Sequence, residues 1–116
     1  MNHYGGEKMN SEQQIFTLIL HSGNGRSFAM EALAFARKND FESAQDSIQK
    51  AKDELVLAHH IQTELIQGEI RGEKAEVSLL MIHAQDHLMN AITVKDLAEE
   101  FVSMYERFGT ISNTNI

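Results

Sequence analysis

The sequence contains no cysteine, no proline and no tryptophan among its 116 residues. Without cysteine there is no disulfide framework, no thiolate nucleophile and no cysteine-based zinc site. The absence of proline removes the strongest helix breaker, and the abundance of Ala, Leu, Glu, Gln, Lys and Met favours helix. The sequence therefore predicts a single all-α domain.

Basic residues are also few, because 10 Lys and Arg stand against 17 Asp and Glu, which gives a formal net charge of -7. Such scattered cations do not form the positive surface that binds phosphate backbones, so nucleic acid is excluded as an expected partner. Charged residues or histidines interrupt every apolar run well before about 18 residues, the length of a membrane span. Residues 1–8 lack the apolar centre of a secretory signal, and we therefore expect a cytoplasmic protein.

Apolar residues recur at helical spacing in three segments of the chain. The first segment opens at Ser11, where Gln14 completes a capping-box pattern. Gly23-Asn24-Gly25 interrupts this segment, and each glycine costs roughly 1 kcal/mol relative to alanine in a helix. We expect a kink, a short break or the close approach of another backbone there. Residues 1–10 show no periodicity and are interpreted as a disordered leader or a cloning remnant.

The second segment begins after a cap at Asn39 or Asp40 and ends near Gly68, where a glycine-containing loop follows. The third spans about 75–108. Residues 109–116 are polar apart from their last position and a single isoleucine, and we expect them to form a frayed tail.

Three helices joined by short links predict an antiparallel three-helix bundle over residues 11–108. The third helix is apolar on more than one face, which two neighbouring helices cannot cover. Copies of the same chain are the simplest cover, so the sequence predicts a closed homo-oligomer with this helix near the symmetry axis. The apolar residues concerned are Val77, Leu79, Leu80, Met81, Ile82, Ala84, Leu88, Met89, Ala91, Ile92, Val94, Leu97 and Ala98.

A polar stripe runs along this apolar helix, because His83, Asp86, His87 and Asn90 fall within a sector of about 100°. Burying four polar side chains costs free energy unless they have hydrogen-bond partners, a metal ion or a reaction to perform. A hydrogen-bonded core histidine and a functional stripe are both consistent with this pattern.

Two kinds of chemistry fit the stripe. His83 and His87, four residues apart, are able to bind one metal ion, and the sequence HAQDH differs from the metalloprotease pattern H-x-x-E-H by one carboxylate. Alternatively, a neutral imidazole attacks a phosphoryl group. A di-iron site is excluded, since it needs Glu-x-x-His pairs. The residues three positions before the histidines of the last two helices are Val56, Leu57, Leu80 and Ala84.

A second polar cluster lies on the preceding helix, where His59 and Gln62 are at helical spacing and are able to face the stripe across the bundle. His60 is expected to be solvated, and Gln62 is expected to form a hydrogen bond in the core. His21 has no assigned role.

The segment Leu79 to Met89, LLMIHAQDHLM, resembles the signature of the enzyme IIA component of the lactose/cellobiose family of the sugar phosphotransferase system. Ala58-His59 with Gln62-Thr63 resembles the second-helix pattern AHxxQT of that family. The similarity covers about Ser11 to Arg107, nearly the whole expected bundle. Further similar segments are Ser22-Gly23, Ala29 to Leu33 and Asn39-Asp40-Phe41.

The resemblance implies a three-helix bundle that assembles as a homotrimer. It implies that His83 accepts a phosphoryl group from the phosphohistidine of HPr and passes it to a cysteine of enzyme IIB. Asp86 would hold a divalent cation such as Mg²⁺ on the trimer axis, while Gln85 and His87 would support the site.

The resemblance also bears on the sugar. A IIA protein of this family contacts no sugar, because the membrane IIC component selects it and is only an indirect partner. Ala84 resembles the cellobiose or chitobiose branch, whereas Asn90 stands where serine or threonine is expected. We expect a role in uptake of a β-linked disaccharide such as cellobiose. A helical oligomeric scaffold with a structural polar stripe and a small metal-dependent hydrolase are the alternatives.

Overall fold

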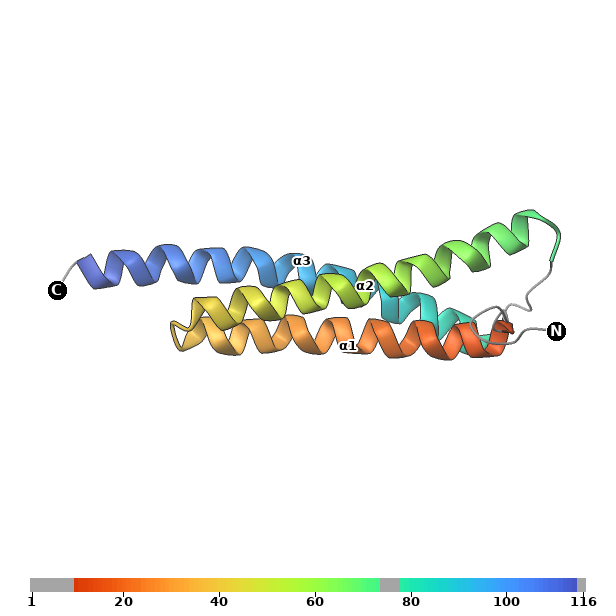
Figure 1. The fold of residues 1–116 in the computed structure, drawn as a ribbon, viewed down its shortest axis with the longest axis horizontal. Helices are drawn as coiled ribbons and strands as arrows, with labels where there is room; N and C mark the ends of the chain where they lie inside the picture. The colour runs from red at the N-terminus through yellow and green to blue at the C-terminus, as the bar shows by residue number, and fades with distance from the viewer. Residues whose placement is uncertain (1–9, 74–77, 115–116) are drawn as a thin grey trace, which may run out of the picture.

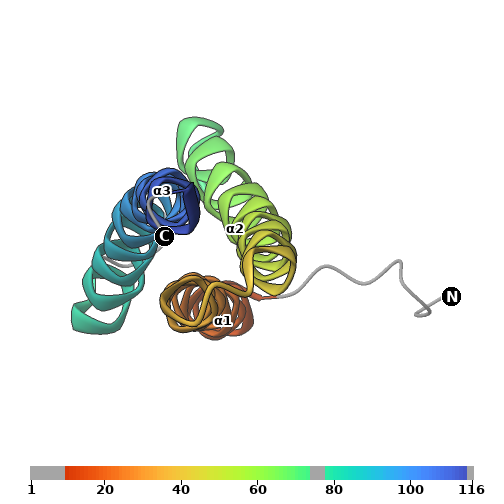
Figure 2. The same cartoon turned by 90° about the vertical axis from the view of Figure 1, so that its left-hand side faces the viewer.

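The computed structural model describes residues 10–73 and 78–114, with side chains up to residue 109. These residues form three α-helices and no strand: α1 (Ser11–Arg37), α2 (Phe41–Ile70) and α3 (Leu79–Thr114). α1 packs lengthwise against both other helices, whereas α2 and α3 contact each other much less. Consecutive helices run in opposite directions (Figure 1), and their axes form a triangle in end view (Figure 2). The predicted antiparallel three-helix bundle is confirmed.

A capping box fixes the start of α1. The Asn10 side chain accepts a hydrogen bond from the Gln13 N–H at 2.8 Å, and the Gln13 side chain accepts one from the Asn10 N–H at 3.0 Å. The predicted box at Ser11 and Gln14 was therefore wrong by one residue, since asparagine caps a helix at least as well as serine. Asn10 belongs to this cap, and the rest of the predicted leader, 1–9, lies outside the described residues.

α1 is continuous through Gly23-Asn24-Gly25, so the predicted break is absent and the predicted close approach is found. A Cβ atom on Gly25 would lie 2.7 Å from Leu55 Cδ2 and 3.5 Å from the carbonyl oxygen of Ala51. α2 therefore packs directly on the glycine surface of α1. This close packing offsets the low helix propensity of glycine.

α2 begins after Asp40, one of the two predicted caps, whose carboxylate accepts from the Ser43 N–H at 3.2 Å. The helix continues two residues past its predicted end at Gly68, which is buried inside it. It stops before Gly72, whose φ of 86° lies in the left-handed region that glycine adopts without strain.

α3 begins at Leu79, later than the predicted start at Ala75, and residues 74–77 lie outside the described part of the chain. The Ser78 hydroxyl accepts a hydrogen bond from the Met81 N–H at 3.1 Å, so Ser78 supplies a local start signal that the apolar periodicity alone did not identify.

Gly109 lies inside α3, although the sequence pattern predicted that it follows the helix, at the start of a frayed tail. A Cβ atom at this position would lie 3.3 Å from Asn39 Oδ1 and 3.4 Å from Phe41 Cζ. The glycine therefore allows α3 to pass close to the turn between α1 and α2. The backbone remains helical to Thr114, six residues beyond the predicted end at Phe108.

The core is divided into two hydrophobic clusters along the bundle. One contains large side chains and packs beneath the first turns of α3, and its buried members are Ile15, Leu18, Leu55, Ala58, Ile61, Leu65, Ala84, Leu88 and Ala91. The other lies toward the α1–α2 turn and is rich in alanine, with buried members Ala29, Ala32, Ala36, Ala44, Ile48, Ala51, Ala98 and Val102. Burial of these side chains supplies the main driving force for folding.

The face of α3 that points away from the core exposes large apolar side chains. Within about 80° of the helix circumference lie Leu79, Ile82, Met89, Leu97 and Met104, and each is exposed by 47% or more. We call these five residues the apolar stripe. The bundle of one chain thus leaves uncovered the additional apolar face that the sequence predicted. None of the helices in the described part is both long and apolar enough to cross a membrane.

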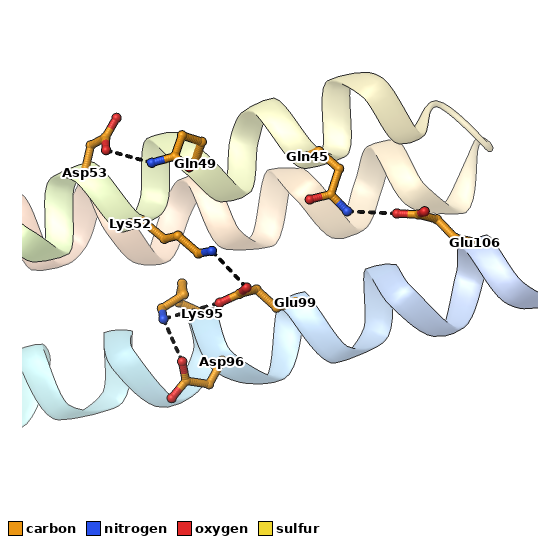
Figure 3. Close-up of polar contacts among 8 residues, drawn as sticks. All are labelled: Gln45, Gln49, Lys52, Asp53, Lys95, Asp96, Glu99 and Glu106. Atoms are coloured by element: carbon orange, nitrogen blue, oxygen red, sulfur yellow. Dashed lines mark hydrogen bonds and ion pairs between the residues drawn. The ribbon is translucent and has the colours of Figure 1, made fainter.

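Polar contacts connect α2 to α3, the pair of helices that lies in least extensive contact (Figure 3). Lys52 Nζ of α2 lies 3.1 Å from Glu99 Oε2 of α3, and Lys95 Nζ, within α3, lies 3.3 Å from Oε1 of the same carboxylate. Nearer the end of the bundle, Gln45 Nε2 donates to Glu106 Oε1 at 2.8 Å. The contacts of Lys52 and Gln45 connect the two helices, although exposed ion pairs contribute only about 0–1 kcal/mol each.

Candidate functional site

The polar stripe predicted from the sequence lies on the first turns of α3. His83, Asp86 and Asn90 are exposed and His87 is half-buried. None of the four is a buried core residue, so the interpretation of these histidines as hydrogen-bonded core residues is wrong for this chain. Asp86 lies within the apolar stripe, between Ile82 and Met89 on the helix surface.

His83 and His87 stack on each other one helical turn apart. Their ring centroids are 5.7 Å apart and the ring planes differ by 14°. Since the nitrogen lone pairs lie in the ring planes, two nearly parallel rings do not direct them at one ion. The geometry favours an exposed imidazole supported by a second ring over a metal site formed by the two histidines.

Gly23 of α1 lies next to the ring of His87. A Cβ atom at Gly23 would lie 3.4 Å from His87 Nε2, so the ring lies beside the part of α1 where Gly23 has no side chain. In the sequence, Gly23 was noted as part of a helix interruption and of a segment similar to the family, with no predicted role beside His87. Its role beside His87 becomes visible once the register of α1 against α3 is known.

Gln85 lies on the other flank of α3, about 160° around the helix axis from His83. Its Oε1 accepts a hydrogen bond from Gln62 Nε2 of α2 at 2.6 Å. The prediction that the second polar cluster faces the polar stripe is therefore wrong, because Gln62 contacts α3 on the side away from His83. His59 and His60 are exposed. A single chain does not bring Gln85 together with the histidine that it is expected to support.

A groove of about 410 Å³ lies between α2 and α3 on the same side as Gln85. Its lining residues are Lys52, Leu55, Val56, His59, Ile92 and Lys95. The two lysines are engaged by carboxylates of α3, as Figure 3 shows. The groove is thus separate from the exposed histidine pair.

His21, which had no predicted role, joins α1 to α2. Its Nδ1 lies 3.1 Å from Glu54 Oε1, which also accepts a hydrogen bond from Asn24 Nδ2 at 2.7 Å. Burial alone would raise the pKa of Glu54, but the hydrogen bonds from Asn24 and His21 and the charge of His21 outweigh it and lower that pKa. This cluster is structural and lies away from the polar stripe.

Within the described part of one chain, no group of three or more His, Asp or Glu side chains is placed to hold a metal ion. Asp86 offers one exposed carboxylate, and carboxylate oxygens are the donors that hard divalent cations prefer. One carboxylate is too few for a cage, but symmetry-related copies of Asp86 would fit such an ion. The donor type is therefore suitable, and the ligand number requires an assembly.

Comparison with known proteins places the chain in a family. The model of the lactose/cellobiose-specific IIA subunit of the phosphotransferase system matches residues 13–106. A lichenan-specific phosphotransferase enzyme IIA component of Bacillus subtilis (strain 168) is 62% identical over 96 residues, which cover 83% of this chain and 87% of that protein.

Two solved structures resemble the fold closely. The cellobiose-specific enzyme IIA of Bacillus anthracis gives a TM-score of 0.85 at 55% identity and covers 92% of this chain and 98% of its own. The chitobiose IIA protein of Escherichia coli, solved in complex with HPr, gives a TM-score of 0.77 at 34% identity and covers 88% and 99%.

The fold and the site define a class of all-α proteins that present an exposed histidine on the third helix of a bundle. The chain belongs to the lactose/cellobiose-specific IIA family of the sugar phosphotransferase system. The resemblance noted in the sequence is thereby confirmed, and so is the assignment as a IIA component of that system.

Proposed function

We propose that this chain is a cytoplasmic phosphocarrier that takes a phosphoryl group from phospho-HPr on His83 and passes it to a cysteine of the cognate enzyme IIB. The observation that carries the proposal is the exposed His83 imidazole, which lies within the motif HAQDH and is supported by the stacked ring of His87. The neighbour solved with HPr supports the choice of donor.

The transfer is a displacement at phosphorus. One ring nitrogen of His83 attacks the phosphorus atom of the donor phosphohistidine, while the donor N–P bond breaks and its electron pair returns to the donor imidazole. The proton on the other nitrogen of each ring stays in place. In the second transfer the N–P bond at His83 breaks as the cysteine thiolate of enzyme IIB forms an S–P bond.

His87 has a supporting role in this scheme. Stacking against its half-buried ring restricts the orientation of His83, so that the attacking nitrogen meets the donor along the line of transfer. His87 in turn lies beside Gly23 of α1. Restricted orientation of the nucleophile lowers the entropy cost of an in-line approach.

We further propose that the chain is a homotrimer with α3 at its centre. The apolar stripe supports this assembly, because a parallel packing of three copies would cover it and would bring three Asp86 carboxylates to the axis. Three carboxylates at one point repel each other unless a cation neutralises them. Asp86 of each chain would hold that ion, for which we propose Mg²⁺, and the ion would supply charge neutralisation at the axis.

The trimer would also complete the site. His83 and Gln85 lie on opposite flanks of α3, so a cyclic arrangement around Asp86 sets the His83 flank of one chain against the Gln85 flank of the next. Gln85 of the neighbouring chain then becomes a donor to the phosphoryl group. In this arrangement every site uses residues of two chains.

For the sugar we propose a β-linked disaccharide such as cellobiose, or the products of lichenan. The names of the relatives support a β-glucoside class, since they include lichenan-specific and cellobiose-specific IIA proteins. The membrane IIC component would bind the sugar itself.

The proposal is tested by measuring intact mass after incubation with phosphoenolpyruvate, enzyme I and HPr. We expect a gain of one phosphate that is labile in acid and absent in His83→Ala. His87→Ala serves as the matched variant and should still gain the phosphate, at a lower rate. A phosphate gain that persists in His83→Ala and disappears in His87→Ala would show that His87, not His83, is the phosphoryl acceptor. No gain in the wild-type chain with active upstream proteins would support the scaffold alternative.

A further inference from the structure

Gln62 and Gln85 join α2 to α3 through a short hydrogen bond between two half-buried amides. Gln62 Nε2 donates to Gln85 Oε1 at 2.6 Å. The other described ties between these helices use lysines or lie nearer the α1–α2 turn. An amide pair differs from an ion pair, because each amide presents either its oxygen or its N–H groups to its partner.

The direction of this hydrogen bond decides which atoms of Gln85 remain for a second contact. Because Gln62 uses the oxygen of Gln85, the remaining hydrogen-bonding groups of Gln85 on its far side are its N–H donors. A phosphoryl group carries negative oxygens that accept hydrogen bonds, and donors held in place before the reaction stabilise its charge best. If the Gln85 amide were turned the other way, its oxygen would face the phosphoryl group and would repel the negative phosphoryl oxygens.

We infer that Gln62 is a positioning residue that acts through Gln85, an inference that rests on the proposed function and trimer. Gln62 fixes the Gln85 amide so that its N–H groups face the phosphoryl group on His83 of the neighbouring chain. Gln62 itself contacts neither His83 nor the phosphoryl group. Gln85 cannot serve His83 of its own chain, because the two side chains lie on opposite flanks of α3.

The decisive variant is Gln62→Glu, which keeps the size of the side chain but removes its donor. A carboxylate at this position accepts from Gln85 Nε2 and therefore turns the Gln85 amide around. We expect the rate of phosphoryl transfer from phospho-HPr to fall on the order of a hundredfold to a thousandfold, the range for loss of one donor to a developing charge. Rapid-quench sampling with intact-mass detection measures this rate.

Three companion variants separate positioning from packing. Gln62→Leu removes the hydrogen bond without forcing a reversal, so we expect a smaller loss than in Gln62→Glu. Gln67→Glu adds the same charge at an exposed position of α2 and should transfer at the wild-type rate. In a Gln85→Ala background, Gln62→Glu should cause no further loss, because its route through Gln85 has been removed.

A mixing experiment tests whether Gln62 acts across the chain boundary. Trimers formed from Gln62→Glu chains and His83→Gln chains place some intact His83 side chains beside an intact Gln62–Gln85 pair. We expect those histidines to regain the wild-type transfer rate, which gives a fast phase absent from Gln62→Glu alone. A mixture without the fast phase, in trimers shown by native mass spectrometry to be mixed, would overturn the inference.

The inference is also overturned if Gln62→Glu and Gln62→Leu both transfer at the wild-type rate, or if Gln62→Glu slows transfer equally with and without Gln85. These outcomes are distinct from failure of the proposed function, in which the wild-type chain itself acquires no phosphate. A Gln62→Glu chain that does not fold leaves Gln62→Leu, tested with and without Gln85, to decide the question.

Discussion

Gly25 of α1 lies so close to Leu55 of α2 that a Cβ atom on the glycine would come within 2.8 Å of the leucine Cγ atom. Leu55 is buried, and the clash includes its Cγ atom as well as a terminal methyl group, so the whole side chain would have to shift. Gly25→Ala should therefore destabilise the bundle by about 1–2 kcal/mol, because the strain of overpacking exceeds the gain in helix propensity. Urea denaturation followed by circular dichroism measures the change.

The matched control is Gly23→Ala, two residues away in the same helix. Its new Cβ would lie 3.4 Å from His87 Nε2, an ordinary contact distance. The gain in helix propensity should then leave stability equal to or above that of the wild type. Equal destabilisation by both substitutions would show that glycine flexibility, and not the contact with Leu55, governs this part of α1.

Glu54 should make the stability of the fold depend on acid. Its folded pKa lies below the ordinary value of 4.5, since hydrogen bonds from Asn24 and His21 outweigh burial. The unfolded chain therefore binds the proton first, and the stabilisation is present above pH 4.5 and is lost as pH falls through the folded pKa. Glu54→Gln should flatten the stability profile below pH 4.5. Thermal unfolding from pH 3 to pH 7 measures this profile.

Glu64→Gln is the control for this experiment, because Glu64 is exposed and its ion pair with His60 is long, at 4.0 Å. Its profile below pH 4.5 should match that of the wild type. If Glu54→Gln also matches the wild type, the cluster with His21 and Asn24 does not contribute to acid sensitivity.

Asp86 should link assembly to a divalent cation in the proposed trimer. A chelator should raise the trimer dissociation constant of the wild-type chain by roughly tenfold or more, because three carboxylates are left unneutralised. Asp86→Asn should assemble equally well with and without the chelator, and Asp86→Lys should not assemble. Sedimentation velocity at several protein concentrations measures these states. A wild-type trimer indifferent to the chelator would contradict the role of the ion.

Lys52 and Glu99 connect α2 to α3 across a sparsely packed boundary (Figure 3). Lys52→Met should reduce stability by no more than about 1 kcal/mol at low ionic strength, and the loss should shrink at high salt. Chemical denaturation at two salt concentrations measures both effects. A loss that is unchanged by salt would show that the charge of Lys52 and its ion pair with Glu99 do not account for the contribution of this residue.

The sequence predicted the class of the fold because its signals were local. Apolar periodicity identified three helices, and Asp40 marked the start of α2. The ends of helices were less predictable, since a glycine either ends a helix or allows another segment to pack closely against it. Gly109 was interpreted as the end of α3, but it is a site of close contact with the α1–α2 turn, which no local pattern reveals.

The candidate site was predictable in part. The helical spacing correctly grouped His83, Asp86 and His87, but the expectation that Gln62 faces this group was wrong, because Gln62 contacts Gln85 instead. The separation of Gln85 from His83 also follows from the 100° step of the helix. The residues of the motif HAQDH are adjacent in sequence and were therefore treated as one group. On a helix, however, residues two positions apart point to different sides of the axis. The stacking of the two rings depends on side-chain rotamers, which the sequence does not encode locally.

The two ends of the core differ in how much change they tolerate. Where alanines fill the space between helices near the α1–α2 turn, an added methyl group forces the helix axes apart, so nearly every enlargement is harmful. The leucines and isoleucines beneath the first turns of α3 exchange for one another at low cost. The interior at the end that carries the histidines should therefore accept more substitutions than the interior at the end that carries none of the chemistry.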